Sequence, residues 1–344
     1  MKKPTYIKLF TLACLALPII GFSQDIHFSQ IYETPLLRNP ALAGLFSGDV
    51  RVQSVYRTQW NSVTVPYQTT SFNGEFKIPV GQYNDFLTIG GQALYDKAGT
   101  TAMSTTHLLP TINYHKALSE EKNMYLSMGF MGGYVQRSID RSKVTTNNQF
   151  DGMSYNPGLS DGENFNRTAY GYFDGSAGIS FNSQLRENEK DNFYLGLAYH
   201  HFNKAKNISF YSDANLEMQP KWVGSAGIRF SMTEYSYFTV EGDFTTQGSY
   251  KEVITGALYS LKLDDPEMPK YSLHFGSYIR WGDAVIPVAK LECSPLTVSA
   301  SYDANVSALT PASRGAGGFE IAISYKKFLN NDNSSKDKVR CPKF

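Results

Sequence analysis

Residues 271–281 read YSLHFGSYIRW, and their apolar and polar side chains alternate. One face carries Tyr271, Leu273, Phe275, Ile279 and Trp281, and the other carries Ser272, His274, Gly276, Tyr278 and Arg280. Because successive side chains of a β-strand point to opposite faces, this stretch predicts a strand with one apolar and one polar face. The pattern recurs between turn residues from Asp191 to Phe328, with no helical stretch between the repeats. Behind an export signal, such repetition is typical of a transmembrane β-barrel.

Fourteen segments of the chain are candidate strands, most of them near the length that a tilted strand needs to cross the hydrocarbon layer. They are 50–60, 67–78, 86–96, 103–116, 123–136, 172–182, 192–201, 221–231, 237–246, 252–261, 271–282, 285–292, 296–305 and 317–328. Acidic side chains such as Glu241 and Asp243 are costly against lipid, so we expect them to face the lumen. The predicted fold class is all-β, a transmembrane antiparallel up-and-down β-barrel of about 14 strands.

The connections between these segments predict the orientation of the barrel. An even strand count places both chain ends on the periplasmic side. Long polar stretches would then lie outside and short turns inside, which is the asymmetry of outer-membrane barrels. The outer stretches are 137–171, 202–220 and 306–316, and the inner turns are 183–191, 232–235 and 293–295.

The amino terminus has the three parts of a secretion signal. Lysines precede the apolar residues 9–20, and the small and polar residues 21–24 follow them. The apolar run is too short for a membrane-spanning helix. We therefore expect residues 1–23 to be a signal peptide, with cleavage near Ser23 after Sec export, and the mature chain to be integral to the outer membrane.

Composition excludes some functions and leaves others open. The formal net charge is +1, so the chain has no strong positive electrostatic field that would attract nucleic acid. Mean hydropathy is −0.32, which suits a barrel because only half of each strand faces lipid. The 23 tyrosines and 22 phenylalanines suit aromatic girdles, although a soluble β-rich secreted protein would favour them as well.

The sequence shows no catalytic or metal-binding constellation that we would defend. Its six histidines form no HExxH, and there is no GxSxG and no phosphate loop. His200 and His201 fall on one predicted strand, so we expect the two rings to point to opposite sides and not to chelate together. The prediction is a protein that is not an enzyme and has no catalytic residue, cofactor or metal.

Two segments lie outside the predicted barrel, which spans residues 50–328. Residues 24–49 contain prolines and glycines that argue against regular sheet, and they could form a plug, a periplasmic docking segment or an inner lining. Residues 329–344 are polar and predict a flexible periplasmic tail.

The mature chain keeps two cysteines, Cys293 and Cys341. In an oxidising periplasm the two thiols could form a disulfide, and two unpaired thiols are the alternative. The predicted topology places the turn at Cys293 on the same side of the membrane as the tail that carries Cys341.

Six stretches carry a family resemblance. They are DIHFSQIY (25–32) with LRNPALAG (37–44), YRTQW (56–60), SYDAN (301–305), GFE (318–320) and CPKF (341–344). In this order they resemble the motifs of the PorP/SprF family of type IX secretion system membrane proteins. The candidate partner-docking or structural residues are Phe28, Ser29, Gln30, Asn39, Pro40, Gly44, Tyr56, Arg57, Trp60, Tyr302, Asp303 and Cys341.

The resemblance implies a fourteen-stranded outer-membrane barrel of the type IX secretion and gliding machinery. Members work with the core secretion apparatus or with individual large secreted adhesins, whose export or surface attachment they assist. The implied partners are therefore type IX components, a secreted surface protein and membrane lipids, and not nucleic acid. The motif residues also have purely structural readings: Asn39, Pro40 and Gly44 could shape a turn, and Asp303 could pair with a lumen arginine such as Arg280.

Two functions therefore stand side by side. An interaction protein would have its lumen blocked by side chains or by residues 24–49. A diffusion pore or hydrophobic-substrate transporter would conduct, and Tyr194, Glu241, Tyr278 and Arg280 would line its path.

Overall fold

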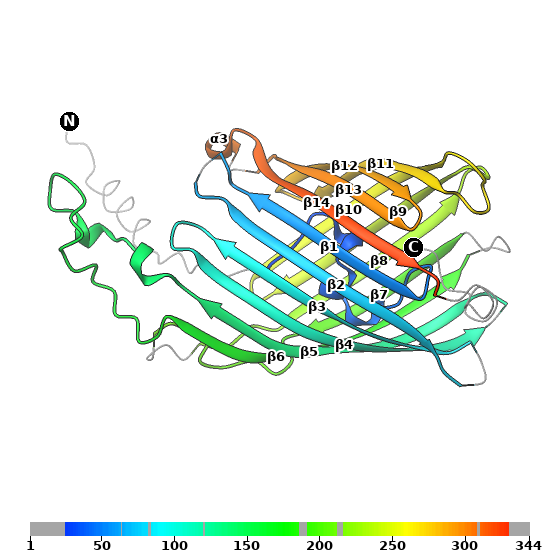
Figure 1. Ribbon diagram of the computed structural model, residues 1–344, viewed down its shortest axis with the longest axis horizontal. Coiled ribbons are helices and arrows are strands. Elements are labelled where there is room, and N and C mark those ends of the chain that lie inside the picture. The colour runs from blue at the N-terminus through cyan, green and yellow to red at the C-terminus, as the bar shows by residue number, and fades with distance from the viewer. Residues whose placement is uncertain are drawn as a thin grey trace, which may run out of the picture.

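The computed structural model describes residues 25–62, 64–81, 84–119, 121–185, 191–211, 216–307 and 310–329. Every strand pairs antiparallel with its sequence neighbours, and the first strand pairs with the last, which closes the sheet into a barrel (Figure 1). Closure leaves no sheet edge, as a bilayer requires, because unpaired backbone groups would find no water there. The predicted fourteen-stranded up-and-down barrel is confirmed.

The strands lie within three residues of their predicted bounds at each end. They are β1 (Val50–Gln59), β2 (Tyr67–Pro79), β3 (Phe86–Ala98), β4 (Met103–Ser119), β5 (Met124–Ser138), β6 (Ala169–Gln184), β7 (Asn192–His200), β8 (Lys221–Ser231), β9 (Ser236–Gln247), β10 (Tyr250–Lys262), β11 (Tyr271–Arg280), β12 (Ala284–Cys293), β13 (Leu296–Asn305) and β14 (Ala316–Lys327). Among the described residues, no helix has the length and hydropathy to cross a bilayer.

Side chains alternate between the outer surface and the interior as the sequence predicts. On β11, Phe275 is 46% exposed on the outside, while Tyr278 is 0% exposed on the inside. Glu241 and Asp243 on β9 are buried in the interior. The outer surface is therefore apolar, and the lumen is filled by polar and charged side chains.

The two ends of the barrel differ in their connections. We call the end with the long connections 139–168, 201–220 and 306–315 the loop end, and the end with the short connections 80–85 and 232–235 the turn end. The connection between β5 and β6 holds η3 (Arg141–Lys143) and η4 (Asn147–Gln149) and projects well beyond the barrel, as the green arm in Figure 1 shows. We call residues 139–168 the arm. The last helix, α3 (Thr310–Ser313), lies in the loop between β13 and β14.

Residues 25–49, which we call the inner segment, lie inside the barrel. They form η1 (Ile31–Glu33), α2 (Pro35–Arg38) and η2 (Pro40–Leu42), drawn in blue within the strands in Figure 1. Proline occupies the first position of both α2 and η2, where the missing N–H costs nothing.

The inner segment runs along the barrel from one end to the other. Asp25 contacts His201 and Lys221 at the loop end, and the Asp49 backbone N–H bonds to the Lys327 carbonyl at the turn end. The expectation that both chain ends lie at the same barrel end holds for β1 and β14 but is wrong for Asp25, because the segment before β1 crosses the lumen. The predicted signal peptide, Gln24 and most of the predicted tail lie outside the described residues.

Candidate functional site

The loop-end half of the inner segment is bound by a buried cluster of charges, which we call the Arg57 cluster: Ser29, Gln30, Arg57, Asp303 and Glu320. The backbone N–H groups of Ser29 and Gln30 donate to the two carboxylate oxygens of Glu320, at 2.6 and 2.9 Å. Arg57 donates to Glu320 and, at 3.0 Å, to Asp303. Ser29 Oγ also donates to Asp303, at 2.8 Å. Four sequence motifs thus converge on one place.

A second arginine completes the charge balance of this cluster. Arg280 on β11 donates to Asp303 Oδ2 at 3.1 Å, so the ion pair expected between these two residues is present. It also donates to Ser29 Oγ, and to Asp283 at 2.9 Å. Two arginines therefore face the two buried carboxylates of Asp303 and Glu320. Removing one partner from such a buried arrangement typically costs about 3–5 kcal/mol, because the remaining charge is left uncompensated.

A separate site around Arg38 holds the middle of the inner segment. Arg38 binds Asp243 in the two-pronged geometry that suits a carboxylate, with both N···O distances at 2.6 Å. It also donates to the Tyr194 hydroxyl at 2.7 Å, and the Tyr194 and Tyr278 hydroxyls donate to Glu241 at 3.0 and 3.2 Å. The polar side chains that a pore would use to tune selectivity are therefore engaged with the inner segment or with one another.

The turn from Asn39 to Gly44 is held by backbone contacts with the wall. Asn39 caps η2 by accepting from the Ala41 N–H at 2.8 Å, and its amide donates to the Ile179 carbonyl at 3.0 Å. The side-chain amide of Asn113 donates to the carbonyls of Ala41 and Ala43, at 2.9 and 2.7 Å. Gly44 has φ +84° and donates its N–H to Glu75 at 2.8 Å.

Glycines in the wall leave room for this turn. A Cβ added at Gly129 would lie 2.4 Å from the carbonyl carbon of Pro40, and one added at Gly178 would lie 1.9 Å from Asn39 Oδ1. The wall and the turn are therefore shaped to each other at Asn39 and Pro40.

Asp25 belongs to an ion-pair network that binds the inner segment at the loop end. Its carboxylate lies 2.7 Å from His201 Nε2 and 2.6 Å from Lys221 Nζ, and His201 Nδ1 lies 2.9 Å from Asp174. Burial would raise the pKa of Asp25, but Lys221 and His201 outweigh it and hold that pKa well below its ordinary value. Burial would lower the pKa of His201, but Asp25 and Asp174 raise it to about 9. The His201 imidazole is therefore charged at neutral pH.

The prediction that the rings of His200 and His201 point to opposite sides is wrong. β7 ends at His200, and His201 has φ +58°, which turns its side chain back into the barrel. Both side chains are buried, with ring centroids 6.3 Å apart, and each has its own hydrogen-bond partners.

The inner segment reaches nearly the whole circumference of the barrel. Its hydrogen bonds and ion pairs involve β1, β2, β4, β6, β7, β8, β9, β11, β12, β13 and β14. Phe28 adds an apolar contact with Val55, Leu94 and Ala322. The inner segment is therefore held by polar contacts from eleven of the fourteen strands.

The remaining candidate residues lie outside both the inner segment and the Arg57 cluster. Tyr56 and Tyr302 are exposed on the outer surface, next to the inward-facing Arg57 and Asp303. Trp60 follows β1 with φ +64° and donates its N–H to the Gly317 carbonyl. Cys341 lies outside the described residues, so its pairing with Cys293 stays a prediction.

Sequence reasoning missed Arg38, Glu75, Asn113 and Glu320 as binding residues. A signal existed for one of them, since Arg38 is the sole charged residue between Glu33 and Asp49. A lone arginine in an apolar segment indicates a buried acidic partner.

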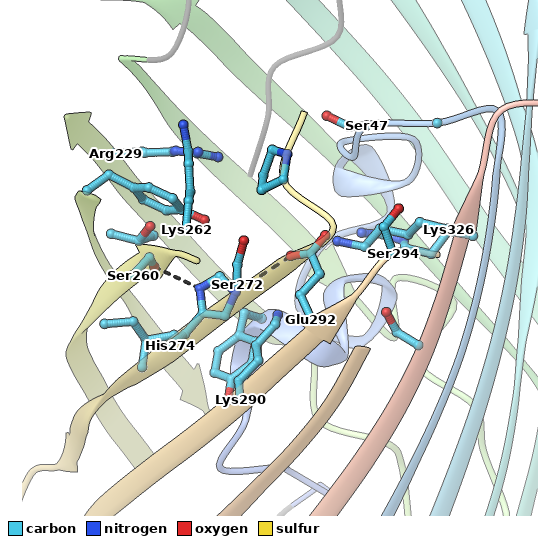
Figure 2. Close-up of a pocket in the computed structure, with 18 of the residues that line it drawn as sticks. Ser47, Arg229, Ser260, Lys262, Ser272, His274, Lys290, Glu292, Ser294 and Lys326 are labelled. Carbon is cyan, nitrogen blue, oxygen red and sulfur yellow. Dashed lines mark hydrogen bonds and ion pairs between the residues drawn. The ribbon is translucent and has the colours of Figure 1, made fainter. Parts of the chain in front are cut away.

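A cavity of about 1120 Å³, lined in part by the inner segment, opens at the turn end (Figure 2). Its polar lining includes Arg229, Ser272, Lys290, Glu292 and Lys326, and we call it the vestibule. Lys290 pairs with Glu33 of the inner segment at 2.7 Å, and His274 lies 3.6 Å from Glu292 and 2.7 Å from Ser260. Its rim contains Cys293 and Asp264, Asp265 and Glu267 of the turn between β10 and β11.

Comparisons with known proteins add a family and a set of distant barrels. The profile of the family described as type IX secretion system membrane protein PorP/SprF matches residues 20–325. No curated protein sequence matches the chain significantly.

Solved structures of outer-membrane proteins are similar only at low identity. The toluene transporter TbuX of Ralstonia pickettii has a TM-score of 0.49 at 8% identity, over 86% of this chain and 94% of its own. The toluene transporter TodX of P. putida has 0.46 at 11% identity, over 85% and 93%. CdiB from Acinetobacter baumannii has 0.46 at 9% identity, over 80% and 60%. At these values none of the three bears on the function of this chain.

Proposed function

Because the chain belongs to the PorP/SprF family of type IX secretion system membrane proteins, we propose that it is a closed outer-membrane barrel that works by binding partner proteins. Its partners would be components of the secretion apparatus and a secreted surface protein, such as a large adhesin, whose export or attachment it assists. The loop end would face the outside of the cell and the turn end the periplasm. The role is binding and not catalysis.

The single observation that carries this proposal is the fixed inner segment. A conducting state would require it to leave contacts on eleven strands, among them the Arg57 cluster. Leaving one buried charge uncompensated costs about 3–5 kcal/mol. Since every 1.4 kcal/mol is tenfold in population, that cost alone limits the open state to roughly one molecule in a thousand.

The arm supports partner binding at the loop end. Phe150, Met153 and Tyr155 are exposed there by 59%, 92% and 53%, well away from the strands that lipid would cover. Exposed apolar side chains gathered on a soluble surface mark interaction sites.

The arm is also held in place before any partner arrives. Arg141 pairs with Asp161, and the Tyr211 hydroxyl donates to Glu163, so the two long loops are tied together. The guanidinium of Arg167 also donates to the Ser209 carbonyl, at 2.8 Å. Such preorganisation lowers the ordering cost of binding.

Two measurements test the proposal. In planar bilayers the purified barrel should show no steady open conductance. A steady conductance would favour the alternative, a diffusion pore or hydrophobic-substrate transporter. In cells, deletion should remove one or a few secreted or surface proteins. Loss of the entire secreted set would instead assign the protein to the core apparatus, and an unchanged set would refute the secretion role.

The arm itself is tested by the double substitution Phe150→Ser and Met153→Ser. We expect the same surface protein to be lost from cells while the amount of folded barrel stays constant. The matched control is Leu263→Ser with Met268→Ser, two exposed apolar side chains in a turn-end connection, which should leave surface display unchanged. Equal surface display in both double variants and in the unmodified protein would exclude the arm as the docking surface.

A further inference from the structure

Two buried polar atoms that line the vestibule have no hydrogen-bond partner among the described residues. They are Nε2 of His274 and Oε1 of Gln53. The two residues are 5% and 3% exposed, so bulk water does not surround them. In the tautomer in which Ser260 donates to His274 Nδ1, at 2.7 Å, Nε2 carries the proton and is a donor. Because buried polar groups of folded proteins are nearly always hydrogen-bonded, a donor and an acceptor without partners in one cavity indicate a binding site.

Lys326 adds a positive charge to the same cavity (Figure 2). Its ammonium forms no hydrogen bond or ion pair with a described residue, and Glu292 attracts it only at longer range. Arg51 lies directly opposite Lys326 across the pair of β1 and β14, where like charges repel, although Arg51 itself binds Glu75 at 2.9 Å. A carboxylate bound at Lys326 would relieve this repulsion and accept from its N–H groups.

The spacing of these groups favours an extended ligand over a small anion. His274 lies on β11 and Lys326 on β14, three strands apart in the sheet. Three strand spacings amount to about 14 Å along the wall, at roughly 4.8 Å each. About four residues of extended peptide span that distance, and their backbone N–H and C=O groups would suit Gln53 and His274.

The rim of the vestibule selects against ligands with many negative charges. The turn between β10 and β11 presents Asp264, Asp265 and Glu267 to the cavity. Two of these carboxylates are fixed by their own turn, since Asp264 accepts from the Lys270 N–H at 3.0 Å and Asp265 from the Glu267 N–H at 2.8 Å. A polyanion would be repelled at this rim, whereas a ligand with one carboxylate and a basic group would be attracted at both places.

We propose that the vestibule binds a short extended peptide segment of a partner protein, with one carboxylate of the segment at Lys326 and a basic residue at the acidic rim. The inference deepens the proposed function and rests on it for the orientation of the barrel, which exposes the vestibule to periplasmic partners.

Peptide binding to the purified full-length barrel in detergent tests the site. The probes are fluorescein-labelled octapeptides of serine and glycine with amidated carboxy ends, which contain one aspartate and one lysine at varied spacing. In matched peptides asparagine replaces the aspartate. We expect at least one aspartate peptide to raise the fluorescence anisotropy on binding, and its asparagine counterpart to bind at least about tenfold more weakly, because a charge-assisted hydrogen bond is lost.

Lys326→Met should weaken the binding of that aspartate peptide by a similar factor. Its urea midpoint should equal that of the unmodified protein, because no ion pair is lost. Lys327→Met is the matched control, since it removes the same charge from the adjacent, exposed position on β14 and should bind the peptide as the unmodified protein does.

Three results would overturn the inference: no binding by any aspartate peptide, equal binding of aspartate and asparagine peptides, or equal affinity in Lys326→Met and the unmodified protein. Complete displacement of the peptide by an equal concentration of succinate would also overturn it, and would assign the vestibule to small anions. Each of these failures would leave the conductance and deletion results unchanged, so it is distinguishable from a failure of the proposed function.

Discussion

Replacing Arg57 with methionine should detach the loop-end half of the inner segment from the barrel wall. The guanidinium is 1% exposed and lies 3.0 Å from Asp303, in contact with Glu320 as well. At an effective dielectric of about 20, one such pair is worth roughly 5 kcal/mol before desolvation is subtracted. Methionine keeps most of the volume, so the loss comes from the uncompensated carboxylates and not from a cavity. We expect a free energy of unfolding lower by about 3–5 kcal/mol.

In Arg57→Met the carboxylate left without a cationic partner should be that of Glu320 and not that of Asp303. Asp303 keeps its bond from Arg280, whereas the Glu320 carboxylate keeps, among the described residues, the two backbone N–H groups of the inner segment. Glu320→Gln in the Arg57→Met background should therefore recover part of the loss, with a coupling energy of about 1–3 kcal/mol.

The assay is urea unfolding of the purified barrel in detergent, followed by tryptophan fluorescence. Tyr56→Phe is the matched control, because Tyr56 is the outward-facing neighbour on the same strand, and it should stay within about 0.5 kcal/mol of the unmodified protein. The reasoning would be refuted by an Arg57→Met variant equally close to the unmodified protein. It would also be refuted by strictly additive losses in Arg57→Met and Glu320→Gln.

Gly129→Ala should lower the free energy of unfolding by about 1–3 kcal/mol, because the added Cβ would lie 2.4 Å from Pro40. Gly74→Ala is the control, because a Cβ added at Gly74 would meet open space. Equal urea midpoints for the two variants would contradict the fit between the turn and the wall. Stability should also fall as pH rises from 6 to 10, measured by the same unfolding. The folded-state pKa of His201 is raised from 6.5 to about 9, so its contribution, roughly 3 kcal/mol, is complete below 6.5 and lost as pH passes 9. The pKa of Asp25 is lowered, so its contribution is present above the ordinary value and lost as pH falls below it. His201→Gln should remove the alkaline loss, and a slope that persists in this variant would assign it to other groups.

The barrel could be predicted from sequence because its environment imposes a simple rule. Lipid on one side and a polar lumen on the other force alternation along each strand, and Phe275 and Tyr278 follow it. The same rule places Asp303 and Arg280 inside, on neighbouring parts of the sheet, which is why their pairing could be expected.

The inner segment could not be placed by any such rule. Its contacts join residues far apart in the chain, such as Arg38 and Asp243, which are 205 positions apart. It has no periodicity, because each of its short helical turns meets a different part of the wall. His201 escaped prediction for a local reason, since a positive φ at the end of β7 reversed the side that strand alternation assigns.

The register at the closure of the barrel has a consequence for assembly. Arg57 on β1 stands directly opposite Glu320 on β14, so these two charges meet only after the first strand has found the last. Residue 49 leads straight into β1, and the backbone of the inner segment at Ser29 and Gln30 bonds to the same Glu320 carboxylate. Before the barrel closes, the charges of Arg57 and Glu320 therefore do not neutralise each other. Closure of the barrel and binding of the inner segment therefore stabilise each other, because both depend on the same buried charges.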